Sequence, residues 1–167
     1  FRVILDNFKF NQDQRWLVFL EDLEQIDDLS LPLLNQNLPI NIYHSKLDED
    51  QKSTTLASFK EKENIILAIK CLDEGVNIPS ASVALIVASS QNYREFIQRR
   101  GRVLRKSKDK IAEIYDILVN PRPLQANNYI EKELKRSYIF AQDSLNKIEA
   151  ESKLNKFSID DHLDPNT

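Results

Sequence analysis

The chain has 167 residues, of which 41% are hydrophobic and 29% are charged, and its formal net charge is −3 at pH 7. These proportions are typical of a globular domain with a core and exclude a disordered chain. A single cysteine excludes an internal disulfide, and no apolar run approaches the ~20 residues that cross a bilayer. Because the chain is mildly acidic, a site that binds nucleic acid or another polyanion would have to be a local basic patch. We therefore expect a cytoplasmic protein with no membrane partner.

Apolar runs and helical patterns alternate along the first two thirds of the chain. Residues 1–14 show no clear period and are interpreted as a lead-in or interdomain linker. In chain order, the patterns then predict a strand over 16–20, a helix over 21–37 kinked at Pro32, a strand over 40–44, a helix over 48–62 capped by Asp48, strands over 64–70 and 83–89, a helix over 92–105 and a strand over 111–118. The apolar runs are continuous rather than alternating, which is typical of a parallel sheet covered on both faces. Residues 15–120 are therefore predicted to form a doubly wound α/β domain with its functional loops at the carboxyl ends of the strands.

The remaining residues, 121–167, are predicted to form a helical extension with a frayed tail. One long, glycine-free helical pattern covers 124–156 and carries a partial apolar stripe. This stripe is compatible with packing on the domain and with docking on a partner domain.

The segment QRRGRVLR, residues 98–105, carries four arginines around one of only two glycines in the chain. From Arg94 to Lys110 there are eight basic residues against Glu95 and Asp109, a net charge of +6 within a chain of net charge −3. Like charges at helical spacing repel, and guanidinium groups match phosphate oxygens, so an anionic partner would relieve the repulsion. Taken alone, such a segment is more often a solvated basic face.

The segment DEGVNIP, residues 73–79, follows the third predicted strand, where an α/β sheet places its working loops. Gly75 allows close approach of a ligand, and Asn77 offers a donor and acceptors to a hydroxyl group. An ordinary turn between strands is the alternative for this segment.

Together these segments resemble the second RecA-like domain of superfamily 2 helicases and translocases. QRRGRVLR is similar to their motif VI, ILAIKCLDEGVNIP (66–79) to motif V, RWLVFLED (15–22) to motif IV, and YHSKLDEDQKSTTLASFK (43–60) to the strand, loop and helix between motifs IV and V. The resemblance covers about residues 15–120. The residues of motifs V and VI are similar to those of DNA-directed members of the broader DEAD/DEAH-type helicases. These members are the xeroderma-pigmentosum-B-like translocases and the helicase subunits of type III restriction systems.

The resemblance implies a RecA-like fold with helices on both faces of a mainly parallel sheet, and it assigns roles to seven residues. Arg102 and Arg105 match arginine fingers that reach the γ-phosphate of ATP, and Gln98 matches a residue that bridges to the ATPase site. The other four matches are Gly75 and Asn77 beside the nucleotide, and Ser45 and Lys70 on the nucleic-acid backbone. Asn77 stands where aspartate is common in the family, which puts its ribose contact in doubt.

Half of an ATPase site is missing from the sequence. With only Gly75 and Gly101, no phosphate-cradling loop of the G-x-x-x-x-G-K-[ST] type exists, and no D-E-x-D or D-E-x-H pair follows an apolar strand to hold Mg²⁺. The chain also lacks methionine, so we expect it to be a processed chain or a piece of a longer parent. The resemblance implies that ATP with Mg²⁺ is held mainly by an N-terminal RecA-like domain of that parent, and that this chain alone is inactive.

Three functions remain open from the sequence. The first is the second motor domain of an ATP-dependent DNA helicase or translocase, with DNA and the N-terminal domain as partners. The second is a binding module for DNA or protein that does not hydrolyse ATP, and the third is the same motor acting on RNA. No resident metal site is predicted, because His44 and His162 are the only histidines and are far apart in the sequence.

Overall fold

The computed structural model describes residues 4, 8–10, 14–61, 65–69, 81–87, 111–118 and 127–160, with side chains in the last range described for 131–156. The chain divides into two compact units, Phe1–Ile117 and Leu118–Thr167. The first contains strands β1 (Trp16–Leu20), β2 (Ile40–Tyr43), β3 (Ile65–Ile69), β4 (Val83–Ile86) and β5 (Glu113–Asp116), with helices α2 (Leu23–Asn35) and α3 (Glu49–Glu61). The second contains helices α5 (Asn127–Gln142) and α6 (Lys147–Asp160).

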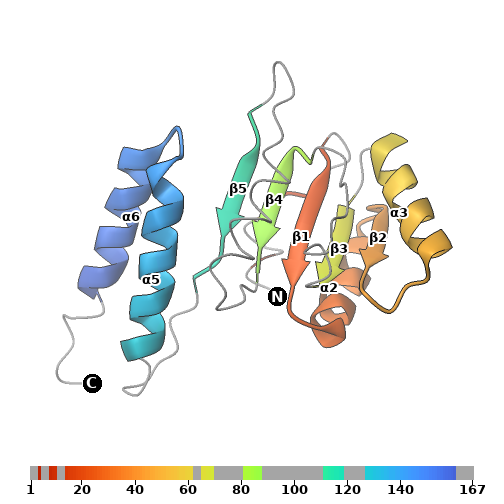
Figure 1. The fold of residues 1–167 in the computed structure, drawn as a ribbon, viewed down its shortest axis with the longest axis horizontal. Coiled ribbons are helices and arrows are strands. Elements are labelled where there is room, and N and C mark those ends of the chain that lie inside the picture. The colour runs from red at the N-terminus through yellow and green to blue at the C-terminus, as the bar shows by residue number, and fades with distance from the viewer. Residues whose placement is uncertain are drawn as a thin grey trace. The chain divides into compact units, whose positions relative to one another are not determined.

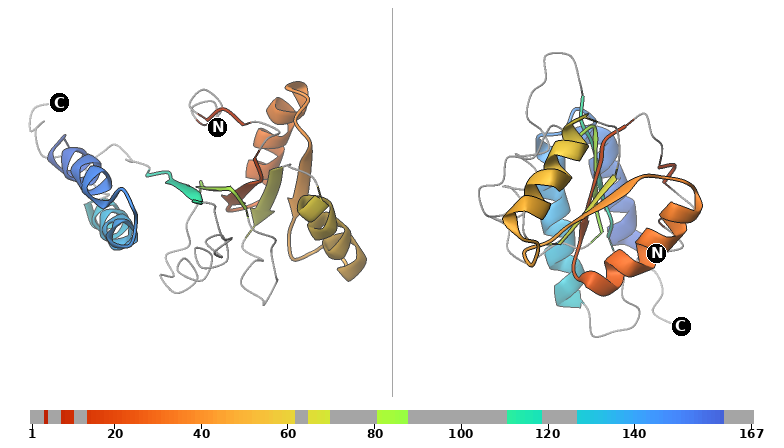
Figure 2. Two further views of the ribbon diagram at one scale, coloured as in Figure 1. Left: turned by 90° about the horizontal axis from the view of Figure 1, so that it is seen from above. Right: turned by 90° about the vertical axis from the view of Figure 1, so that its right-hand side faces the viewer.

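The five strands form one parallel sheet in the order β2-β3-β1-β4-β5, as the continuous apolar runs predict (Figure 1). Every residue of β1 and β4 is buried, whereas the edge strands β2 and β5 are only partly covered. Helices α2 and α3 lie on opposite faces of the sheet (Figure 2). This is the RecA-like doubly wound arrangement expected from the sequence.

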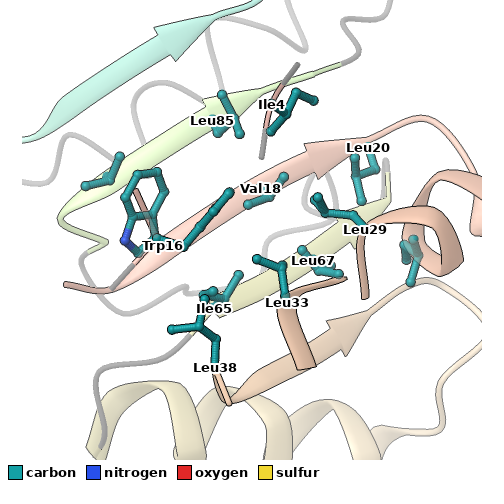
Figure 3. Close-up of a cluster of buried hydrophobic side chains, with 13 residues drawn as sticks. Ile4, Trp16, Val18, Leu20, Leu29, Leu33, Leu38, Ile65, Leu67 and Leu85 are labelled. Atoms are coloured by element: carbon teal, nitrogen blue, oxygen red, sulfur yellow. The ribbon is translucent and has the colours of Figure 1, made fainter. Parts of the chain in front are cut away.

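The main core lies between the sheet and α2. Alternate residues of a strand point to opposite faces, and Trp16, Val18 and Leu20 of β1 point to the face that α2 covers. From α2, Ile26, Leu29 and Leu33 pack into the same cluster, together with residues of β3 and β4 that share the face (Figure 3).

The lead-in contributes to this core as well. Ile4 and Phe10 are buried in the cluster, and Phe8 packs against it. The ring of Phe8 meets Tyr115 of β5 edge to face at a centroid distance of 5.0 Å, and the ring of Phe10 lies 4.5 Å from that of Trp16. These side chains therefore cover the β1 to β5 part of the same sheet face, while α2 contacts β2 and β3. Their role as an interdomain linker stays a prediction.

Helices α2 and α3 each begin with a reciprocal pair of side-chain hydrogen bonds. Asp22 Oδ1 accepts from the Gln25 amide at 2.9 Å, and Gln25 Oε1 accepts from the Glu21 amide at 2.9 Å. At α3, Asp48 Oδ1 accepts from the Gln51 amide at 2.7 Å, and Gln51 Oε1 accepts from the Asp48 amide at 3.1 Å. The second arrangement is a capping box, and it confirms Asp48 as the N-cap.

The single helix predicted over 124–156 is wrong in one respect, because the structure has a helical hairpin there. Helix α5 ends at Gln142, and the turn residues Asp143 to Asn146 precede α6. The amide and hydroxyl of Ser144 both donate to the Ala141 carbonyl, at 3.0 and 2.8 Å, which ends α5. Ser and Asp compete for backbone hydrogen bonds in this way and so favour helix ends over helix interiors.

Side-chain hydrogen bonds connect the two helices of the hairpin. The Tyr138 hydroxyl donates to Asn155, and the Gln142 side-chain amide donates to Glu151 at 2.7 Å. On the exposed surface of α6, a hydrogen bond and the positive charge from Lys153 hold the pKa of Glu149 below its ordinary value. Ala141 and Leu154 are the buried apolar residues of this unit among the side chains that are described.

Candidate nucleotide and nucleic-acid site

The carboxyl ends of the strands meet at one edge of the sheet. The strand register places Tyr43, Ala68, Phe19, Ile86 and Asp116 in a single row across all five strands. The residues that follow this row therefore share the edge where a parallel sheet binds its ligands. Of the seven predicted site residues, Ser45 lies within the described residues, and Gln98, Arg102, Arg105, Gly75, Asn77 and Lys70 lie outside them.

Ser45 lies two residues beyond the end of β2, in an exposed turn. The turn is closed by the Leu47 amide, which donates to the His44 carbonyl at 3.2 Å, and α3 begins directly after it. An exposed hydroxyl at this edge can donate to a phosphate oxygen of a nucleic-acid backbone. The position of Ser45 is therefore compatible with the role that the resemblance implies.

The connections that carry the other predicted segments begin at the same edge. Lys70 follows Ile69 directly, so the segment with Gly75 and Asn77 is reached from the carboxyl end of β3. The segment with Gln98, Arg102 and Arg105 belongs to the connection between β4 and β5, which starts at the carboxyl end of β4.

The sheet order locates a topological switch point at this edge. From β1 the chain continues through α2 to β2 on one side of the sheet, whereas from β4, the neighbour of β1, it continues to β5 on the other side. In open α/β sheets, ligands bind at the carboxyl ends of neighbouring strands whose connections diverge in this way. Strands β1 and β4 are such a pair, and the arginine-rich segment belongs to the connection that starts from β4.

The helix N-termini at this edge are occupied by their own caps. Asp22 and Asp48 supply carboxylates to the first turns of α2 and α3, and Glu24 and Glu49 add further negative charge there. A helix N-terminus binds phosphate through free amides and its positive dipole end, and a capping carboxylate satisfies both. The first turns of α2 and α3 are therefore poor phosphate sites. Phosphate binding at this edge would depend on side chains, such as those of the predicted residues Lys70, Arg102 and Arg105.

His44 is a residue at this edge that the sequence did not single out as functional. Its Nδ1 atom is buried, and no hydrogen-bond partner for it exists in the described part of the chain. A buried polar atom without a partner is costly, and such atoms call for an explanation. Only the placement of a histidine at the carboxyl end of a predicted strand could have drawn attention to it.

The described residues contain no candidate metal site. No group of three histidine, cysteine or acidic side chains is close enough to hold a metal ion in the ranges that the structure describes. Within those ranges, no helix is long and apolar enough to cross a membrane.

At the β5 edge, the Tyr115 hydroxyl donates a hydrogen bond of 2.8 Å to Glu113. This hydrogen bond, partial burial and the negative charge of Glu113 raise the pKa of Tyr115 above its ordinary value of 10.0. That phenol therefore stays protonated at physiological pH.

Comparison with known families and curated proteins agrees with this geometry. Residues 1–107 match the family model described as the helicase conserved C-terminal domain, a range that includes all seven predicted site residues. The DNA 3'-5' translocase XPB2 of Sulfurisphaera tokodaii is 34% identical over 118 residues, which cover 70% of this chain and 25% of that protein. The endoribonuclease Dicer homolog 2a of Oryza sativa subsp. japonica is 28% identical over 149 residues, which cover 83% of this chain and 10% of that protein. The chain thus spans a quarter or less of the length of these relatives.

Solved structures show the same fold. The C-terminal domain of the DEAD-box protein Dbp5 superposes with a TM-score of 0.63 at 15% identity, covering 88% of this chain and 84% of that one. Domain 2 of the DEAD-box helicase Mss116p, solved bound to an RNA duplex, has a TM-score of 0.53 at 19% identity and covers 70% of this chain and 45% of that one. At these identities the likeness concerns the fold alone.

Proposed function

Because the chain belongs to the helicase conserved C-terminal domain family of superfamily 2, we propose that it is the second motor domain of an ATP-dependent DNA helicase or translocase. In this proposal it completes an ATP site held mainly by an N-terminal RecA-like domain of the parent and supplies part of the nucleic-acid track. The observation that carries the proposal is the arginine-rich segment 98–105, which lies in the connection from β4 at the switch point of the sheet.

Arg102 and Arg105 are proposed to stabilise the charge that develops on the γ-phosphoryl group during its transfer to water. ATP would supply the phosphoryl group and Mg²⁺, held mainly by the N-terminal domain, would neutralise part of its charge, while the guanidinium groups of Arg102 and Arg105 would add positive charge from this domain. Gln98 is proposed to link the two domains, and Gly75 and Asn77 to line the nucleotide. Arginine fingers of this kind contribute on the order of 10³–10⁵ to the rate in nucleoside triphosphatases.

Ser45 and Lys70 are proposed to hold the nucleic-acid backbone. Ser45 would donate its hydroxyl to a phosphate oxygen. Lys70, which directly follows β3, the strand that pairs with β2, would contribute a positive charge. Backbone contacts of this kind position the strand without reading its sequence. Movement along DNA would then follow from opening and closing of the two domains around ATP.

DNA is proposed as the substrate because the DNA translocase XPB2 is 34% identical to the chain. RNA is the second candidate, since RNA helicases such as PRP5 of Saccharomyces cerevisiae, 26% identical over 101 residues, are also similar to it. The 2′-hydroxyl is the group by which a protein distinguishes the two nucleic acids, so the choice depends on contacts made in the complex.

The test is ATP hydrolysis by the full-length parent without nucleic acid and with duplex DNA, single-stranded DNA or RNA. We expect stimulation by DNA, and we expect Arg105→Ala to lower the stimulated rate by about 10³-fold, the low end for an arginine finger. Ser45→Ala should instead raise the DNA concentration needed for half-maximal stimulation. Lys60→Ala, which removes an exposed positive charge from α3, is the control and should change neither quantity.

Stimulation by RNA alone would transfer the proposal to an RNA motor. If Arg105→Ala weakens nucleic-acid binding and leaves the saturated rate of hydrolysis unchanged, the segment binds nucleic acid and the proposed finger role is wrong. No hydrolysis by the parent under any condition would favour a binding module.

A further inference from the structure

Helix α2 exposes leucines on the side that faces away from the sheet. Leu23, Leu31 and Leu34 are 43%, 65% and 52% exposed, although the helix already buries Ile26, Leu29 and Leu33 in the core. At 100° per residue the three exposed leucines fall within about 80° of one another, on a stripe separate from the buried one. We use the name outer face of α2 for six exposed residues of this helix, Leu23, Glu24, Asp27, Asp28, Leu31 and Leu34.

Helix α3 provides an internal comparison, because it covers the other face of the same sheet and has the same length. Its exposed residues are Glu49, Asp50, Gln51, Ser53, Thr54, Ala57, Lys60 and Glu61, none of which is a large apolar residue. A helix that contacts one layer needs a single apolar stripe, and α3 follows that pattern. The second stripe of α2 is therefore not required by the sheet.

The outer face of α2 is also strongly acidic. Residues 21–37 contain five acidic residues and neither lysine nor arginine. Glu24, Asp27 and Asp28 are exposed, and among the described residues none of the three forms an ion pair. The negative potential repels a phosphate backbone and attracts a positively charged partner, so nucleic acid is excluded as the occupant.

We propose that the outer face of α2 binds a basic amphipathic helix of a partner protein. The apolar residues of that helix would cover Leu31 and Leu34, and its lysines or arginines would pair with Glu24, Asp27 and Asp28. Apolar contact supplies most of the affinity in such a mode, and complementary charge supplies the association rate and the choice of partner. Three leucines and three acids form a small surface, which corresponds to a weak and transient interaction. This inference is independent of the proposed motor function.

The first experiment identifies what contacts this face in the full-length protein. A photo-crosslinking benzoylphenylalanine is placed at Leu31, and in a matched control at Thr54, which is exposed on α3. After irradiation in the native cells, the crosslinked peptides are sequenced. We expect the Leu31 site, but not the Thr54 site, to capture a peptide with apolar residues at helical spacing and an excess of lysine and arginine.

Several outcomes of this experiment would overturn the proposal. They are an acidic or neutral peptide, nucleic acid, a second copy of this chain, residues 118–167 of the same chain, or crosslinking no greater than at Thr54. Each names another occupant or none at all.

The second experiment tests the contributions of charge pairing and apolar contact to binding. Its probe is a synthetic copy of the captured peptide. Asp27→Asn with Asp28→Asn should weaken binding about tenfold and reduce its dependence on salt, because two attractive charges are lost. Leu31→Ser with Leu34→Ser should weaken binding at least as much and leave the salt dependence in place. Glu61→Gln on α3 is the control, and circular dichroism confirms that each variant is folded. Binding unchanged by the loss of both aspartates would refute the proposed charge pairing.

Discussion

Asn37 shows how a single residue shapes the end of α2. It has a φ angle of 56°, and it is the one non-glycine residue with positive φ in the described part of the chain. The Leu38 amide donates to the Leu33 carbonyl at 3.2 Å and the Asn37 amide to the Leu34 carbonyl at 2.9 Å, which together form a Schellman motif. Leu38 is buried in the same cluster as Leu33, so the motif returns the chain to the core before β2 begins.

The left-handed conformation gives a prediction at this scale. Asn37→Ala should lower the free energy of unfolding by about 1 kcal/mol, because a β-carbon is disfavoured at positive φ and alanine lacks the local hydrogen bonding that helps asparagine. Asn37→Gly should match or exceed the original stability. Urea unfolding followed by circular dichroism measures both, and an alanine variant as stable as the glycine variant would contradict the explanation.

Single residues also show what local sequence can predict. Asp48 is predicted to be a helix cap because an aspartate there starts a helical pattern. Its glutamine partner three positions later, which the structure shows, is a further signal that is visible without a fold. Asp22 and Gln25 have the same spacing and could have been found in the same way. Asn37 could not, since asparagine occurs in many conformations and the packing of Leu38 determines which one it adopts.

The lead-in is the element whose role depends most on the assembled sheet. Its sequence has no clear period, yet Phe8 and Phe10 contact Tyr115 and Trp16, which are about 100 residues apart in the chain. A pattern confined to residues 1–14 contains no information about those partners, because they are brought together only by the pairing of β1, β4 and β5. The burial of the lead-in therefore could not be predicted from its own sequence.

Removing one lead-in ring should destabilise the whole first unit. Phe10→Ala is expected to lower the free energy of unfolding by about 3 kcal/mol, since it leaves a cavity beside Trp16 in the main core. Ile111→Ala, at an exposed apolar residue, is the control and should change it by less than about 0.5 kcal/mol. Thermal and urea unfolding measure both, and equal stabilities would mean that the lead-in does not contribute to folding.

The strands illustrate the part of the fold that the sequence does determine. The wholly apolar runs of β1 and β4 became fully buried inner strands, whereas the runs INIY and EIYD, which include polar residues, became the partly exposed edges β2 and β5. Composition thus distinguishes central from edge strands. It does not determine which apolar strand pairs with which, because any two of them offer similar surfaces to a parallel neighbour.

At the scale of the whole molecule, the predicted site is shared between distant segments and a second domain. Ser45, Gly75 and Arg105 are predicted site residues through motif resemblance, and the topology shows that the connections carrying them begin at one edge of the sheet. In the proposed function, the distance between the arginines and a phosphate would depend on closure of two domains, which no local pattern encodes. The roles of the residues can therefore be proposed from sequence, whereas their geometry cannot.

The proposed division of the ATP site between two domains gives the last prediction. The purified chain should release no phosphate from ATP above background, because its two glycines, Gly75 and Gly101, cannot form a phosphate-cradling loop. Adding the N-terminal RecA-like domain of the parent should produce hydrolysis that requires both partners, and Arg105→Ala in this chain should remove it. Phosphate release is measured for each domain alone, for the mixture and for the mixture with the variant. Turnover by this chain alone that disappears in Arg105→Ala would mean that it carries a complete site, and the shared-site mechanism would be wrong.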